Sequence, residues 1–347
     1  MVTERIFDLA ARAWQASDVQ FTEMPGGAST RRFFRVSAGE HSGVAMFVPD
    51  ATRPDEIAKT SEAGRRWPFL EVRELLEARG VNVPRLLAED CDHGFILVED
   101  LGDETLARYL ERTPDAKAAI YRRAVLDLAA AQRALDPSQQ GALPQDSIVR
   151  ARAFDFDLLK WEVDHFVEWG MDARCLPLSL EDRAAFERAA VYLAREIERW
   201  PRAFVHRDYQ SRNLMVRHVE KEPQLVWIDF QDALLGPRVY DLVALLNDSY
   251  QSFSREFVEQ RLAEYSEALG LGEEDRARVV WEFDFVTVQR KLKDAGRFVY
   301  IDRVRGNPDY LGFVEPTIDK ALSSLARLTE DPELSALERT LRRVTGR

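Results

Sequence analysis

The sequence has few of the features that place a protein in a membrane or outside the cell. It contains two cysteines, Cys91 and Cys175, which are too few for a disulfide framework or a four-cysteine metal site. No segment reaches the ~18 apolar residues that a bilayer-spanning helix needs. The N-terminus, MVTERIFDLAARAWQ, carries Glu4 and Asp8 and has no basic start, so it predicts an amphipathic helix and not a signal peptide. We therefore expect a cytoplasmic protein with no membrane partner.

An excess of positive charge is also lacking. Lys and Arg total 48 against 60 Asp and Glu, and the formal net charge of −12 argues against nucleic acid as the main partner. A phosphate ligand would need cations concentrated in a cleft, or a metal ion that supplies the charge. At 347 residues, of which 46% are hydrophobic, the chain is long enough for two lobes, and we expect a monomer.

The first hundred residues have the composition of a small antiparallel sheet. Short segments rich in Val and Phe, separated by turn-forming residues, predict strands at 19–24, 31–37, 43–49, 83–90 and 94–102. Pro68 begins a predicted helix, and Gly80 falls where the C-terminal cap of that helix is expected. The last apolar run stops at Glu99, Asp100 and Gly102, which we interpret as the boundary between two lobes.

The remainder of the chain is predominantly helical by its apolar spacing. The exception is a small hairpin, expected from two short apolar pieces at 214–216 and 225–228. Asp241 directly precedes the apolar helix LVALLNDSY and is interpreted as its N-cap. The predicted fold class is α+β, with a small antiparallel-sheet N-terminal lobe (residues 1–100) and a larger helical C-terminal lobe (residues 101–347).

The segment HRDYQSRNLMV carries the strongest chemical signal. His206, Arg207, Asp208 and Asn213 match the H-R-D-x-x-x-x-N pattern of protein-kinase catalytic loops, and Asp229 opens Asp-Phe-Gln where kinases have Asp-Phe-Gly. Mg²⁺ prefers oxygen ligands, which an amide and a carboxylate supply, and an attacking hydroxyl needs a carboxylate that takes its proton. An isolated Asp or Asn in a loop most often stabilises a turn, but the ordered set favours Asp208 as base and Asn213 and Asp229 as metal ligands.

A second segment, PGGASTRRFFR, predicts a strand-turn-strand cover over nucleotide phosphates. Gly26 and Gly27 allow the backbone to approach a ligand closely, and Ser29 and Thr30 add hydroxyl donors. A simple hairpin turn is the alternative, since the kinase G-x-G-x-x-G spacing is absent. The N-terminal lobe is thus expected to bind ATP, with adenine on backbone groups near two residues of the lobe boundary, Glu99 and Leu101.

The lysine that kinases carry on the third strand is missing. In the segment Val-Ala-Met-Phe, Phe47 stands where that lysine would be. Candidates for the replacement cation are Arg31, Arg32 and Lys59, and Arg32 is our choice for cofactor binding, although for each of them a solvated surface charge is the more usual role. Glu71 and Glu74, one helical turn apart, are candidates for the acid that pairs with this cation, with surface exposure as the alternative.

With these residues considered together, the chain resembles the aminoglycoside phosphotransferase and choline kinase superfamily, whose members share the protein-kinase-like fold. Within it, the chain is most similar to the bacterial anomeric kinases for cell-wall sugars. The pieces that carry this resemblance are GGASTRRFFRV, NVPRLLAED, LVEDLGDETL, HRDYQSRNLMV, IDFQDALLGPRVYDLVALLNDSY and QRKLKDAGRFVYIDR. They extend over nearly the whole chain.

The resemblance implies an ATP- and Mg²⁺-dependent enzyme that phosphorylates the anomeric hydroxyl of N-acetylmuramate or N-acetylglucosamine in peptidoglycan recycling. It places the sugar-binding residues in the helical lobe. The candidates for contact with the amino sugar are Glu162, Trp169, Tyr209, Gln210, Arg290 and Lys293. For several of these, packing or salt bridging is an equal alternative. A kinase for another hydroxyl compound, such as an aminoglycoside or choline, and a catalytically silent nucleotide-binding regulator are the alternative functions.

Overall fold

The computed structural model describes residues 2–25, 31–49, 67–220 and 222–347. The chain forms two compact units. The first consists of Met1–Arg112 and Arg212–Gln231, and the second of Thr113–Ser211 and Asp232–Arg347. The segment Arg212–Gln231 therefore groups with the N-terminal part of the chain, whereas the sequence suggested one division near residue 100. The functions assigned to the two lobes stay predictions.

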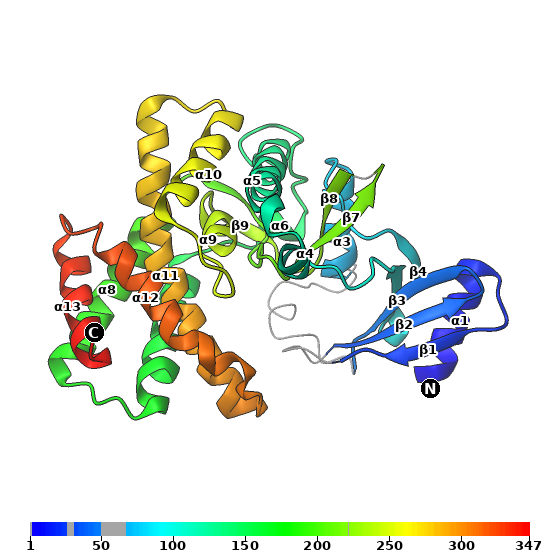
Figure 1. Ribbon diagram of the computed structural model, residues 1–347, viewed down its shortest axis with the longest axis horizontal. Helices are drawn as coiled ribbons and strands as arrows, with labels where there is room; N and C mark the ends of the chain where they lie inside the picture. The colour runs from blue at the N-terminus through cyan, green and yellow to red at the C-terminus, as the bar shows by residue number, and fades with distance from the viewer. Residues whose placement is uncertain (1, 26–30, 50–66, 221) are drawn as a thin grey trace. The chain divides into compact units, whose positions relative to one another are not determined.

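The first unit is built on a five-stranded antiparallel sheet with the strand order β1-β2-β3-β5-β4 (Figure 1). The strands are β1 (Gln20–Glu23), β2 (Arg32–Ala38), β3 (His41–Phe47), β4 (Leu86–Asp90) and β5 (Phe95–Glu99), with the 3₁₀ turn η1 (Cys91–His93) between the last two. Each of these strands falls within or overlaps a segment predicted as a strand, so strand composition and turn-forming residues were informative here.

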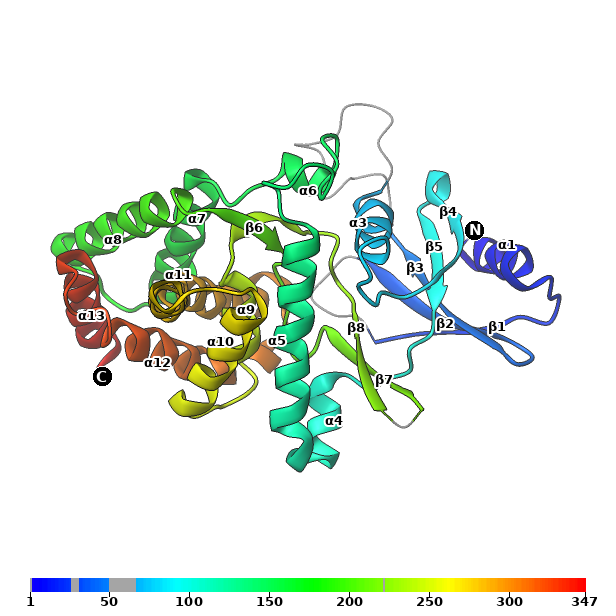
Figure 2. The same ribbon diagram turned by 90° about the horizontal axis from the view of Figure 1, so that it is seen from above.

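Two helices cover opposite faces of this sheet, as Figure 2 shows. Successive strand residues point to opposite faces, so Ala45 and Leu97 join the core beneath α1 (Val2–Trp14), while Met46 and Ile96 pack with Leu70 of α3 (Pro68–Glu77). The end of α3 is a Schellman motif, in which the N–H of Gly80 donates to Glu77 O and the N–H of Val81 to Leu76 O. Gly80 has φ +77°, which confirms the predicted capping glycine.

Among the described residues, the first unit also contains a hairpin and a short helix. The hairpin strands are β7 (Leu214–Val219) and β8 (Glu222–Trp227), as the sequence predicted, and the helix is α4 (Leu106–Arg112). Leu214 pairs with Trp227 at the open end of the hairpin. The N–H of Val216 donates to Glu104 O at 2.8 Å, which attaches the hairpin to the chain segment that precedes α4.

The second unit is mostly helical, as expected. Its elements are η2 (Pro114–Ala116), α5 (Lys117–Ala134), α6 (Ile148–Ala151), α7 (Phe156–His165), η3 (Phe166–Met171), η4 (Asp172–Arg174), α8 (Leu180–Glu198), β6 (Arg202–Val205), β9 (Leu234–Pro237), α9 (Tyr240–Leu246), α10 (Arg255–Ala268), α11 (Glu273–Arg305), η5 (Pro308–Phe313), α12 (Val314–Leu325) and α13 (Pro332–Thr345). The strands β6 and β9 form a two-stranded antiparallel sheet. None of the helices among the described residues has an apolar stretch long enough to cross a membrane.

The long helix α11 organises this unit, and α7, η3, α9 and α12 pack against it (Figure 1). It approaches a neighbour closely at Gly296. A Cβ atom there would lie 2.9 Å from the carbonyl oxygen of His165 and 2.9 Å from Cα of Phe166. Only glycine permits this contact, which fixes the position of α11 against the junction where α7 continues into the π-helical segment η3.

Candidate active site

The loop that follows β6 carries Asp208, and a buried carboxylate holds its beginning. Asp241 accepts a hydrogen bond from the backbone N–H of His206 at 2.6 Å and another from that of Arg207 at 3.0 Å. Asp241 lies inside α9, whose N-cap is Val239. Our interpretation of Asp241 as an N-cap was therefore wrong. Its carboxylate satisfies N–H groups of the loop and not of its own helix.

A signal for this role was present in the sequence. Every residue of α9 is buried, and a helix that is apolar on all sides must be enclosed by protein. An acid at the start of such a helix is buried as well, and a buried carboxylate needs donors. The donors themselves are the N–H groups of His206 and Arg207, which lie 35 and 34 positions away in the sequence and which only the structure identifies.

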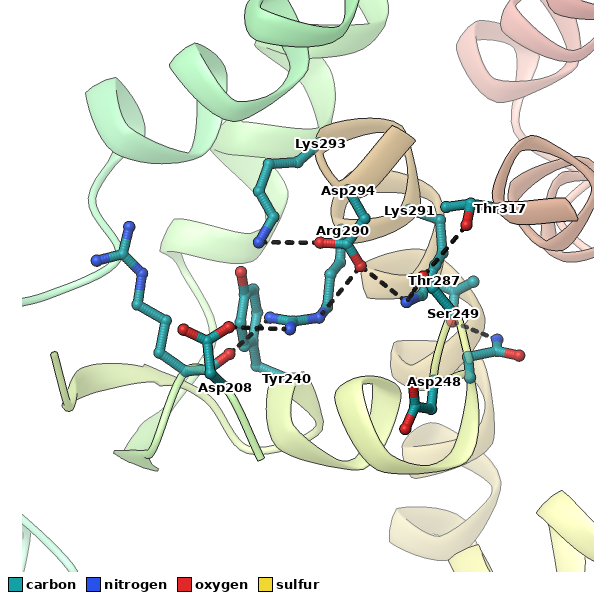
Figure 3. A network of polar contacts seen from close by, with 12 residues as sticks. Asp208, Tyr240, Asp248, Ser249, Thr287, Arg290, Lys291, Lys293, Asp294 and Thr317 are labelled. Atoms are coloured by element: carbon teal, nitrogen blue, oxygen red, sulfur yellow. Dashed lines mark hydrogen bonds and ion pairs between the residues drawn. The ribbon is translucent and has the colours of Figure 1, made fainter. Parts of the chain in front are cut away.

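Arg290 of α11 fixes the next part of the loop (Figure 3). Its Nη1 donates to the carbonyl oxygen of Arg207 at 2.8 Å, and its Nη2 lies 3.5 Å from Oδ1 of Asp208. Arg207 has φ +83°, a left-handed conformation that costs a non-glycine residue free energy. The guanidinium of Arg290 lies over the ring of Tyr240 at 4.5 Å, and only 2% of its side chain is exposed. Arg290 therefore positions Asp208 and is not open to a ligand.

The cations around Asp208 keep it ionised. Burial raises the pKa of Asp208, but Lys293, Arg290 and Arg207 together outweigh burial, so its pKa lies below the ordinary carboxyl value. The side chain is 38% exposed, so a ligand can reach it. Asp208 is thus a carboxylate at neutral pH, held in one orientation and accessible, as a base that accepts a proton from a hydroxyl must be.

The far end of the loop is anchored to two more elements of the second unit. The hydroxyl of Tyr209 donates to Ala124 O of α5 at 2.9 Å, and this side chain is fully buried. Asp248 accepts from the backbone N–H of Ser211 at 3.0 Å and from its hydroxyl. Gln210 is half-buried, and its N–H donates to Asp208 O at 2.9 Å. Tyr209 therefore holds the loop in place, which is a different role from the sugar contact that we expected.

The first unit contains the two expected metal ligands, next to each other at the open end of the β7–β8 hairpin. Asn213 precedes β7 and Asp229 follows β8. The N–H of Ile228 donates to Asn213 O at 3.1 Å, so the backbone joins the two positions. Asp229 has φ +63°, and the following Phe230 is buried against Phe69 of α3, with ring centroids 5.1 Å apart. Packing of Phe230 holds the turn that presents Asp229.

Two side chains of the first unit lie close to the carboxylate of Asp229. Nε2 of Gln231 donates to its Oδ1 at 2.9 Å, and a guanidinium nitrogen of Arg31 lies 3.6 Å from the same atom. Gln231, which replaces the kinase glycine, thus orients the acid. Within the described ranges no group of three His, Cys, Asp or Glu could hold a metal ion. The hard oxygens of Asn213 and Asp229 fit Mg²⁺ with further ligands from phosphate.

The expected nucleotide-binding residues are only partly described. Gly26, Gly27, Ser29 and Thr30 lie outside the described residues, as does Lys59. Arg32 begins β2 and forms a two-point pair with Glu23, at 2.7 and 2.8 Å, on the exposed side of the strand. Of the two candidate cations that the structure describes, Arg31 is the one whose guanidinium lies near an expected metal ligand.

The residues at the end of β5 are occupied by polar contacts. Oε1 of Glu99 lies 3.4 Å from Arg217, and its Oε2 accepts from the backbone N–H of Arg85 at 3.2 Å. Leu101 is half-buried. Phe47 stacks on Phe95, with ring centroids 4.5 Å apart, so the position of the kinase lysine is used for packing. Binding of adenine near Glu99 and Leu101 stays a prediction.

The remaining sugar candidates differ in accessibility. Glu162 is fully buried, where its carboxylate accepts from Nε2 of Gln289 at 2.7 Å and from the hydroxyl of Tyr240 at 3.4 Å. Trp169 packs edge-on against Tyr300, with ring centroids 5.0 Å apart. Lys293 lies beside Tyr240 and Asp208 (Figure 3). Arg290 and Lys293 thus lie near Asp208, whereas Glu162 is buried and accepts a hydrogen bond from the hydroxyl of Tyr240.

Comparison with known proteins assigns a class to this arrangement. Residues 20–279, more than half of the chain, match the model of a family described as the phosphotransferase enzyme family. The chain belongs to this family and is a phosphotransferase. It is 36% identical to the N-acetylmuramate/N-acetylglucosamine kinase of Pseudomonas aeruginosa, over 89% of this chain and 85% of that protein. It is 32% identical to the same-named kinase of Pseudomonas putida, over 92% of this chain and 90% of the relative.

Solved structures confirm the fold. A microcompartment-associated aminopropanol kinase superposes with a TM-score of 0.61 at 16% sequence identity, covering 98% of this chain and 100% of that one. At this identity the likeness concerns the fold alone. The predicted kinase-like fold, with a small antiparallel sheet in the N-terminal part and a helical remainder, is confirmed.

Proposed function

We propose that this chain is an ATP- and Mg²⁺-dependent kinase that phosphorylates the anomeric hydroxyl of N-acetylmuramate and N-acetylglucosamine, in peptidoglycan recycling. The observation that carries this proposal is the 36% identity, over most of both chains, to a kinase named for these two sugars. The site supports it, because Asp208 is an accessible carboxylate fixed by buried partners. A cytoplasmic location and a monomeric state are further expectations.

In the proposed reaction Asp208 accepts the proton of the sugar hydroxyl while the hydroxyl oxygen attacks the γ-phosphorus of ATP. The bond between that phosphorus and the bridging oxygen of ADP breaks, and ADP leaves with the electron pair. An anomeric hydroxyl is more acidic than an ordinary sugar hydroxyl. A carboxylate with a lowered pKa is therefore a sufficient base for this acceptor.

Asn213 and Asp229 would hold Mg²⁺, which neutralises the charge on the phosphates when bound. Neighbouring residues orient Asp229. Gln231 fixes the carboxylate of Asp229 through one hydrogen bond, and the stacked pair Phe69 and Phe230 fixes its backbone. Loss of either oxygen ligand should therefore reduce the rate severely.

Replacement of the base tests the proposal. We expect the Asp208→Asn variant to lose sugar-dependent ADP formation by about 10²- to 10⁴-fold, the usual contribution of a general base. The matched control is Asp115→Asn, which removes an exposed carboxylate of η2 and should leave the rate unchanged. Undiminished turnover by Asp208→Asn would refute the assignment.

The product identifies the acceptor. Phosphorus NMR of the wild-type chain with ATP, Mg²⁺ and a panel of amino sugars, aminoglycosides and choline should show a new anomeric phosphate doublet with the two N-acetyl sugars. A different phosphoester would indicate another small-molecule kinase. Binding of ATP without turnover of any acceptor would indicate a regulator.

A further inference from the structure

One turn of α11 beside Asp208 carries three cations around one carboxylate. Nζ of Lys291 lies 2.8 Å from Oδ2 of Asp294, Nζ of Lys293 lies 3.0 Å from its Oδ1, and Nε of Arg290 lies 3.8 Å from its Oδ2. Burial raises the pKa of Asp294, but these cations outweigh it, so the pKa lies far below the ordinary carboxyl value. The negative charge of Asp294 thus faces three positive charges, and this turn of α11 has a net positive charge.

Two of the three cations are buried and bonded to groups of the protein. Arg290 is 2% exposed, donates to the carbonyl oxygen of Arg207 and stacks on Tyr240. Lys291 is 1% exposed and donates to Oγ of Ser249 at 3.3 Å as well as to Asp294. The N–H groups of these two side chains attach the catalytic loop, and the segment that follows α9, to α11. Neither side chain can reach a ligand without disturbing that packing.

Lys293 differs from them. Its side chain is 15% exposed, and Asp294 is its ion-pair partner within the part of the chain that the structure describes. Figure 3 shows its ammonium directed toward the hydroxyl of Tyr240, on the side of the network where the carboxylate of Asp208 lies. Burial lowers the pKa of Lys293, but the adjacent carboxylate of Asp294 opposes burial, so the pKa is raised and the group is charged at neutral pH.

An ammonium group has three N–H donors, and Asp294 accounts for one direction only. A charged donor beside the base, partly shielded from water, attracts an anionic ligand strongly. Two sources of anion are relevant in a kinase, namely the transferred phosphate and a carboxylate on the acceptor. N-acetylmuramate carries a carboxylate on an ether at C3, two ring carbons from the anomeric carbon, and N-acetylglucosamine has a neutral hydroxyl there.

We propose that Lys293 binds the carboxylate of an acidic acceptor and so sets the preference of the site for N-acetylmuramate over its neutral counterpart. This inference rests on the proposed function. Arg290 is the positioning residue for Asp208, whereas Lys293 distinguishes between acceptors that present the same anomeric hydroxyl. Asp294 forms an ion pair with each of these two cations.

The test is the ratio of kcat/KM for N-acetylmuramate to kcat/KM for N-acetylglucosamine at fixed ATP and Mg²⁺. We expect Lys293→Met to lower this ratio about 10- to 100-fold, through a higher KM for N-acetylmuramate, because a hydrogen bond to a charged group is lost. Lys293→Arg should restore part of the ratio. Lys293→Gln, which keeps a donor without the charge, gives the same comparison if the methionine variant does not fold.

Lys291→Met is the matched control, since it removes a cation from the same turn and the same counter-ion. It should affect both sugars alike and leave the ratio within about threefold of wild type. An unchanged ratio in Lys293→Met, with a raised KM for ATP for both sugars, would assign Lys293 to the phosphate and overturn the inference. If wild type phosphorylates neither sugar, the proposed function fails and this inference fails with it.

Discussion

The backbone N–H of His206 donates to the buried carboxylate of Asp241 at 2.6 Å, across 35 positions of sequence. The same carboxylate accepts from Arg207, whose φ of +83° makes the loop costly to form. The geometry of Asp208 thus depends on a residue that has no contact with any reacting group in the proposed mechanism.

Removal of the Asp241 carboxylate should loosen this loop. The Asp241→Ala variant leaves two buried N–H groups without an acceptor, and we expect a loss of about 2–4 kcal/mol in unfolding free energy, measured by urea denaturation. Asp241→Asn keeps one acceptor and should lose less. In the control Asp172→Asn, an exposed pair with Arg183 is broken, which should leave the unfolding free energy nearly unchanged. Equal losses in Asp241→Ala and the control would contradict the buried role.

Asn213 should determine the requirement for Mg²⁺. The Asn213→Ala variant removes one of two proposed oxygen ligands, so the Mg²⁺ concentration at half-maximal rate should rise about 10-fold or more. The measurement is a Mg²⁺ titration of ADP formation at saturating ATP and sugar. Asn82→Ala, which removes an amide that bonds to Leu225 O in the same unit, is the control and should leave the Mg²⁺ dependence unchanged. A shift of the same size in both variants would count against a metal role for Asn213.

The cations beside Asp208 should determine the acid limit of activity. Because its pKa is lowered, Asp208 stays ionised at every pH above the ordinary carboxyl value, and activity is lost only as pH falls further. In Arg290→Gln a lowering charge is removed while burial still raises the pKa, so the acid limb of kcat/KM moves to higher pH. We expect kcat/KM at pH 7 to fall about 10-fold as well, since the bond to Arg207 is weakened.

Arg290→Lys serves as the comparison for this prediction because it keeps the positive charge. Its acid limb should move less than that of Arg290→Gln. The profile is measured with N-acetylglucosamine, which has no carboxylate of its own to titrate. An acid limb that stays in place in both variants would show that Arg290 does not control the ionisation of Asp208.

The close contact at Gly296 should not tolerate a methyl group. In Gly296→Ala the new Cβ meets backbone atoms of His165 and Phe166 at 2.9 Å, and neither can move without shifting α7 and η3. We expect a loss of about 1–3 kcal/mol in unfolding free energy, measured by denaturation. Gly312→Ala, where a Cβ would meet nothing within 4 Å, is the control. Equal stability of the two variants would show that the helices separate easily.

Many helices and strands of the fold could be predicted from short segments of the sequence. Short segments rich in Val and Phe, bounded by turn-forming residues, predicted the five strands of the first unit, and the positive φ of Gly80 follows from its place after a helix. The order of Asp208, Asn213 and Asp229 along the chain was sufficient to suggest phosphoryl transfer. These signals are local because the composition of a strand, and the φ angles and hydrogen bonds of a turn or cap, involve neighbours in sequence.

Other assignments depended on residues distant in sequence. The sequence suggested Tyr209 and Glu162 as sugar contacts, yet Tyr209 anchors the loop to α5 and Glu162 is enclosed behind Tyr240. It also suggested that Asp241 caps its own helix. In each case a polar side chain is buried by elements that lie far away in the chain, and the pattern around a residue does not show which distant donor or acceptor will satisfy it.

The sequence by itself determined which elements form and which residue types are available for the proposed chemistry. The tertiary structure decided that Arg207, Arg290 and Lys293 lie around Asp208, and that Lys293 is 15% exposed whereas Arg290 is only 2% exposed. The physical reason is that secondary structure follows from short-range geometry, whereas the burial and ionisation of a charged side chain depend on every element that packs around it.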